Sequence, residues 1–154
     1  MPLTLTIPDD YGYVLLSATA ASFLTALHTL RTAKFRKLAK IPYPNTYATA
    51  EQASASEPAY LFNCAQRAHA NFLEAQPSAI TTLLIAGLEY PRAAAGLGLA
   101  WCFARGLYLY GYTKPIEKGN VNGSGRRVGG WGSLALLGLF GMSAATGYKF
   151  IMRA

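Results

Sequence analysis

The stretch YGYVLLSATAASFLTALHTL, Tyr11–Leu30, carries no formal charge over 20 residues. A helix of that length crosses about 30 Å of hydrocarbon. Three more stretches share this character: Ala68–Leu88 with one acid, Ala93–Thr113 with one base, and Val128–Tyr148 with no charge. A transmembrane barrel would need alternating segments of about ten residues instead. The pattern therefore predicts an all-α chain with four transmembrane helices.

The composition agrees with this prediction. Hydrophobic residues make up 52% of the chain and charged residues 14%, against roughly 25% charged in soluble globular proteins. A soluble bundle of such apolar helices would lack a polar exterior. We predict one transmembrane four-helix domain over residues 1–154, with helices at roughly 11–30, 60–88, 93–113 and 128–150. Met1–Asp10 carries two acids and no base, so we expect no cleaved leader peptide.

The basic residues predict the topology. The net charge is +7, but the bases lie between apolar runs, which does not make the dense face that nucleic acid requires. The two loops 31–58 and 114–127 hold nine Lys or Arg, whereas the opposite side holds Arg92, Lys149 and Arg153. The positive-inside rule places these loops in the cytosol and both termini in the lumen.

The two cysteines, Cys64 and Cys102, fall within apolar segments and have no CxxC or Cys/His spacing. We expect buried free thiols and no metal site.

A few polar residues interrupt the second helix. Arg67, Asn71 and Glu74 have offsets of 0, 4 and 7, which project within roughly 60° of one another on a helix. His69 points to the opposite side. Charged groups at membrane depth are costly and usually functional. Arginine takes a carboxylate bidentately, glutamate takes an ammonium, and asparagine pairs with amides, so this stripe suits a zwitterionic, peptide-like ligand.

The third helix carries a second stripe, Arg105, Tyr108 and Tyr112, with offsets of 0, 3 and 7. The two stripes can face one cavity. Two alternatives stay open from the residues alone. Arg105 and Glu74 can form an internal pair that satisfies itself, and the tyrosines can serve as interface anchors.

The segment FNCAQRAHANFLE, Phe62–Glu74, resembles the signature of the MAPEG superfamily, the membrane-associated proteins in eicosanoid and glutathione metabolism. LGLAWCFARGLYLYGY, Leu97–Tyr112, resembles the third helix of that family. GSLALLGLFG, Gly132–Gly141, and YGYVLLSATAASF, Tyr11–Phe23, are also similar to their counterparts. The sequence is most similar to the microsomal glutathione S-transferase 3 branch. The resemblance implies a homotrimer that binds glutathione between subunits near the cytosolic side.

The resemblance also implies roles for particular residues in the second helix. Arg67, Asn71 and Glu74 match positions that hold the glutathione backbone, and His69 matches a contact from the neighbouring subunit. Ala75 stands where related leukotriene C4 synthases carry a tyrosine, so that contact is missing.

Other matches lie on the remaining helices and loops. Tyr108 and Tyr112 match tyrosines of the site, and Arg105 matches an arginine that either pairs within the bundle or contacts the ligand. The thiol-activating arginine matches Arg126 or Arg127, with Arg126 preferred. The basic group after the first helix aligns ambiguously: Arg31 and Lys34 are both candidates for contact with a glutathione carboxylate.

These matches predict an enzyme that uses glutathione as co-substrate. It would be a glutathione transferase, with possible glutathione peroxidase and leukotriene C4 synthase-type activity, acting on lipophilic electrophiles or lipid hydroperoxides from the surrounding membrane lipids. The predicted location is the endoplasmic reticulum, with the mitochondrial outer membrane as the alternative. The functional alternative is a non-catalytic lipid-binding scaffold, like 5-lipoxygenase-activating protein, or a structural subunit of a membrane complex.

Overall fold

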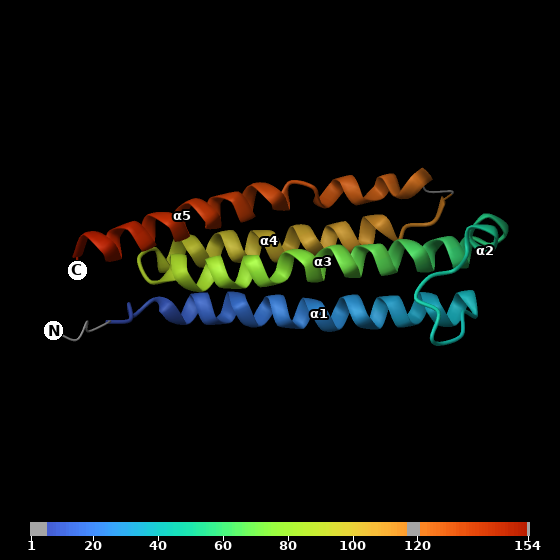
Figure 1. The fold of residues 1–154 in the computed structure, drawn as a ribbon, viewed down its shortest axis with the longest axis horizontal. Helices are drawn as coiled ribbons and strands as arrows, with labels where there is room; N and C mark the ends of the chain where they lie inside the picture. The colour runs from blue at the N-terminus through green and yellow to red at the C-terminus, as the bar shows by residue number, and fades with distance from the viewer. Residues whose placement is uncertain (1–5, 117–120, 154) are drawn as a thin grey trace. The chain divides into compact units, whose positions relative to one another are not determined.

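The computed structural model describes residues 6–116 and 121–153, and it is helical over most of that range (Figure 1). Lys118, one of the basic loop residues, lies outside the described residues. The α-helices and the 3-10 helix η2 are, in chain order, α1 Tyr11–Ala39, α2 Ala50–Ala55, α3 Glu57–Gly87, α4 Pro91–Tyr112, η2 Val121–Gly129 and α5 Gly132–Arg153. No strand occurs among the described residues, so the all-α prediction is confirmed for them.

Helix α1 continues beyond Leu30, where we expected it to end, and stops at Ala39. The added residues 31–39 contain four bases among Thr, Ala, Phe and Leu, and Lys and Arg are good helix formers outside the lipid. Lys40 follows with a φ of 53°, the left-handed conformation that commonly ends a helix. The basic residues after the apolar run therefore extend a helix rather than begin a loop.

Two helices, α1 and α5, are long and apolar enough to cross a membrane. Helix α3 includes Arg67, Asn71, Glu74 and Gln76, and such polar side chains lower its mean hydropathy. Membrane crossing by α3 and α4, and the four-helix bundle, stay predictions.

The chain forms two compact units. The first contains the described residues of Met1–Ser22, Ala75–Cys102 and Trp131–Ala154; the second contains those of Phe23–Glu74 and Phe103–Gly130. In the first unit, Val14, Leu83 and Leu139 form a buried apolar cluster with alanines of α3 and α4. Glycine allows close packing there, because a Cβ on Gly98 would collide with Ser17. Small residues of this kind let neighbouring helix backbones approach closely.

Ion pairs lie at the turn between α3 and α4 in the first unit. Glu89 accepts hydrogen bonds from Arg153 at 2.5 Å and from Lys149 at 3.3 Å. Arg92 pairs with Asp10 at 2.7 Å. These contacts join both ends of the described chain to the α3–α4 turn within this unit.

The second unit has its own core, in which Phe35, Ile41, Leu61 and Phe62 are buried. Asn63 holds the loop before α2 onto α3, because its amide both accepts from the Ala48 N–H at 2.8 Å and donates to the Ala48 carbonyl at 2.9 Å. This unit positions the candidate site.

Candidate functional site

All the predicted site residues lie in the second unit. They are Arg31 and Lys34 of α1; Arg67, His69, Asn71 and Glu74 of α3; Arg105, Tyr108 and Tyr112 of α4; and Arg126 and Arg127 of η2. The structure divides eight of them among three places, and His69, Glu74 and Arg127 lie outside these places. Four of the eleven are exposed on the surface: Lys34, Arg67, Glu74 and Arg127.

The first place is a pocket of about 370 Å³. Arg67 and Tyr112 line it, as the two stripes on α3 and α4 predict. It is also lined by four residues that the sequence reasoning did not single out: Tyr60, Asn63, Cys64 and Gly123. Tyr60 precedes Arg67 by seven residues, so both project from nearly the same face of α3. This seven-residue spacing could have identified Tyr60 as a candidate site residue from the sequence.

Gly123 organises the η2 side of this pocket. Its N–H donates a hydrogen bond to the Tyr60 hydroxyl at 2.6 Å, and its carbonyl accepts one from Arg126 at 2.9 Å. Its φ is 67°, and a Cβ at this position would collide with the ring of Tyr112. Glycine is the residue that tolerates both the left-handed backbone and this close approach. Gly123 therefore holds η2 against α3 and α4.

Arg126 contacts two residues that line this pocket, Gly123 and Tyr112. Its guanidinium carbon is 5.4 Å from the centre of the Tyr112 ring, within the range of a cation–π contact. Arg127, the other candidate, is exposed. The geometry thus separates two adjacent arginines that the sequence alone left as alternatives.

Cys64 is buried and forms part of the pocket wall. A buried free cysteine behaves as a small apolar side chain, so Cys64 contributes packing to the wall of the pocket.

The second place joins Asn71, Arg105 and Tyr108. Arg105 is 8% exposed and donates from Nη2 to the Asn71 Oδ1 at 2.5 Å. Its guanidinium carbon is 4.8 Å from the centre of the Tyr108 ring. Tyr108 in turn meets Tyr112 edge to face, with 5.5 Å between ring centres. The two predicted stripes therefore face each other, and Tyr108 connects this polar group to the pocket.

His69 lies apart from the pocket lining. Its ring centre is 5.9 Å from that of His28 on α1. His28 is fully buried and stacks on Phe72 at 4.5 Å. The orientation of His69 away from Arg67 follows the helical spacing.

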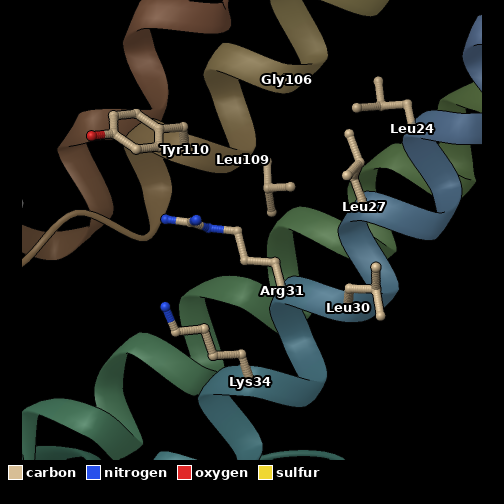
Figure 2. Close-up of a pocket in the computed structure, with 8 residues that line it drawn as sticks. All are labelled: Leu24, Leu27, Leu30, Arg31, Lys34, Gly106, Leu109 and Tyr110. Atoms are coloured by element: carbon tan, nitrogen blue, oxygen red, sulfur yellow. The ribbon is translucent and has the colours of Figure 1, made fainter.

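The third place is a groove formed by α1 and α4, which is lined by Arg31, Lys34 and Tyr110 among others (Figure 2). Within one chain, these two bases do not line the pocket that contains Arg67.

Two of the described helices are long and apolar enough to cross a membrane, and polar side chains of α3 and α4 meet at Asn71 and Arg105. The model of the MAPEG family matches residues 14–145. The chain belongs to the MAPEG family, whose members are membrane-associated and include membrane glutathione transferases and also proteins without enzymatic activity.

Proposed function

We propose that this chain is a membrane-bound glutathione S-transferase, of the microsomal glutathione S-transferase 3 branch of its family, with glutathione-dependent peroxidase activity toward lipid hydroperoxides. The observation that carries this proposal is the pocket of about 370 Å³ that contains Arg67 and Tyr112, with Arg126 in contact with Tyr112. Its volume lies within the range of small-molecule sites.

Charge supports glutathione as the ligand. Glutathione has two carboxylates and one ammonium group, and its thiolate adds a further negative charge. Arg67 and Arg126 offer two guanidinium groups, which pair well with carboxylates and with developing anions. The hydroxyl groups of Tyr60 and Tyr112 and the amide of Asn63 add polar partners for the peptide groups.

Arg126 is the proposed thiolate-stabilising residue. A free thiol has a pKa of about 8.5 and is only a few per cent ionised at pH 7. Arginine does not act as a base, because it stays protonated in proteins. It lowers the pKa of a nearby thiol by favouring the anion, and each unit corresponds to about 1.36 kcal/mol. The proton leaves to water, and the thiolate becomes the nucleophile.

Two reactions follow from one thiolate. Attack on an epoxide carbon forms a carbon–sulfur bond and opens the ring to an alkoxide, which takes a proton from water. Attack on the terminal oxygen of a hydroperoxide breaks the O–O bond and releases an alcohol. The sulfur keeps the transferred hydroxyl group as a glutathione sulfenic acid, and the departing alkoxide takes a proton from water. The thiol of a second glutathione then attacks the sulfenic sulfur, so that an S–S bond forms, the S–O bond breaks, and glutathione disulfide and water are released.

The remaining predicted residues fit a site shared between subunits. Glu74 is exposed and lies outside the pocket lining, on the same face of α3 as Arg67. In the homotrimer that we propose, Glu74, Asn71 and His69 would meet glutathione at a subunit boundary. We also propose an endoplasmic reticulum location with basic loops in the cytosol and both termini in the lumen.

The test is turnover by the purified full-length protein in detergent, with glutathione and a panel of electrophiles and lipid hydroperoxides. We expect conjugate or glutathione disulfide to form at a rate that saturates with glutathione. Saturable glutathione binding without either product would support the non-catalytic scaffold instead. Absence of binding would refute the proposed site.

A further inference from the structure

The groove between α1 and α4 in the second unit has an apolar wall and a basic end (Figure 2). Its volume is about 360 Å³. Leu24, Leu27 and Leu30 line one side from α1, and Gly106 and Leu109 line the other from α4. Gly106 leaves free space in the groove, because the nearest atom to a Cβ built at this position is a Leu24 methyl at 4.0 Å.

Arg31 is held in place at the basic end of this groove. Its Nε donates to the Thr113 hydroxyl at 2.5 Å, and its guanidinium carbon lies 5.3 Å from the Tyr110 ring centre and 5.4 Å from that of Phe35. Lys34 lies about one helical turn further along α1, and Figure 2 shows its nitrogen on the same side of the groove as that of Arg31. Thus two cations line this groove, and a hydrogen bond and two ring contacts fix the position of one of them, Arg31.

Within residues 6–116 and 121–153, no Asp or Glu forms an ion pair with either cation, Arg31 or Lys34. The first unit offers a contrast: a groove of about 540 Å³ that includes Leu16, Gly96 and Leu99 also has a cation at its edge, Arg92. That arginine is paired with Asp10. Of these two grooves, only the one beside Arg31 has cations that form no ion pair with a carboxylate of the described residues.

We infer that the α1–α4 groove binds one anionic phospholipid of the surrounding membrane. An acyl chain would lie along Leu24, Leu27 and Leu30, which span about 9 Å of the helix. The phosphate would meet Arg31 and Lys34, which directly follow the uncharged run Tyr11–Leu30 and so stand at the depth of the lipid headgroups. Basic residues at such positions attract anionic lipids, and the planar Arg31 guanidinium pairs with phosphate bidentately.

The test measures lipid retention rather than turnover, so it is independent of the proposed enzymatic function. The full-length protein is equilibrated with mixed micelles that contain equal parts of phosphatidylcholine and phosphatidylglycerol. Native mass spectrometry then counts the lipids that stay bound. We expect preferential retention of phosphatidylglycerol, reduced roughly tenfold in Arg31→Gln/Lys34→Gln.

Gly106→Leu fills the groove without changing its charge, and it should reduce retention as well. Gly96→Leu is the matched control in the other groove, where a Cβ meets nothing within 4 Å, and it should retain phosphatidylglycerol as the unmodified protein does. Each variant is first compared with the unmodified protein by circular dichroism. Equal retention of the two lipids, or equal losses in Gly106→Leu and Gly96→Leu, would overturn the inference. A groove covered by a second copy of the chain would retain no anionic lipid, which would overturn it too.

Discussion

The Gly123 N–H donates a hydrogen bond to the Tyr60 hydroxyl across 2.6 Å, which joins η2 to a residue 63 positions earlier in α3. The carbonyl of the same glycine accepts from Arg126. Tyr60 therefore helps to position the arginine that we propose as the thiolate-stabilising group.

Tyr60→Phe removes this hydrogen bond and keeps the ring. We expect kcat with glutathione to fall roughly five- to tenfold, the rate equivalent of one hydrogen bond of about 1 kcal/mol, with a smaller change in the KM for glutathione. The ultraviolet absorbance of bound thiolate, followed against pH, should shift to higher pH. Tyr43→Phe is the control, because Tyr43 is 79% exposed. An unchanged thiolate titration in Tyr60→Phe would contradict the positioning role.

Gly123→Ala should reduce the stability and the activity of the protein more than the loss of one buried hydrogen bond does. Alanine at a φ of 67° is strained by about 1–3 kcal/mol, and its Cβ collides with Tyr112. We expect lower thermal stability and loss of thiolate formation together. Gly141→Ala provides the comparison, since nothing lies within 4 Å of a Cβ there. Equal behaviour of the two variants would argue against the role of Gly123.

Arg126→Gln should reduce kcat/KM roughly 100-fold, as loss of a group that stabilises a developing anion does. Arg126→Lys keeps the positive charge but loses the planar guanidinium group with its paired N–H donors. Its activity should therefore lie between those of the unmodified protein and Arg126→Gln. Arg127→Gln should cause a much smaller fall because Arg127 is exposed. The measurement is the initial rate with saturating electrophile and varied glutathione. A larger loss in Arg127→Gln than in Arg126→Gln would reverse the assignment.

Asn71→Leu removes the acceptor that Arg105 meets at 2.5 Å. The expected loss of stability is about 1–2 kcal/mol, because a buried charge loses a hydrogen bond and polar contacts inside membrane proteins are of modest strength. Asn71→Asp keeps an acceptor and should restore much of the stability. Unfolding of the detergent-solubilised protein in increasing dodecyl sulfate measures the difference. If the leucine and aspartate variants unfold alike, the hydrogen bond is not the cause.

Stability should also depend on pH through Glu89. Hydrogen bonds and charge from Arg153 and Lys149 hold the pKa of the Glu89 carboxyl below its usual value, which is about 4.3. These contacts therefore stabilise the folded state above that pH, and the contribution disappears as the pH falls through the folded pKa. The unfolding temperature should thus decline more steeply on acidification in the unmodified protein than in Glu89→Gln. Parallel curves for the two proteins would rule out this linkage, which salt should weaken.

The helical fold was predictable because helix periodicity and hydropathy are local properties. The uncharged run Tyr11–Leu30 lies within α1, and most of the segment Val128–Tyr148 lies within α5; these are the two helices that are apolar and long enough to cross a membrane. The predicted start of the fourth helix at residue 128 was wrong, because Val128 and Gly129 belong to the 3-10 helix η2 and α5 begins at Gly132. The end of α1 was not predictable in this way. Hydropathy marks where a helix would leave the lipid, whereas the backbone continues until Ala39, because lysine and arginine favour a helix in water as well.

The sequence by itself determined the membrane-associated class, the family and the stripes on α3 and α4, since spacing on one helix decides which side chains share a face. Only the tertiary structure decided that Arg67 and Tyr112 share a pocket with Tyr60 and Gly123, and that Arg126 rather than Arg127 stands beside it. It also placed Arg31 and Lys34 in a separate groove. The physical reason is that these arrangements depend on contacts between distant segments, such as the left-handed turn at Gly123 and its hydrogen bond to Tyr60. No local pattern of residues encodes these contacts.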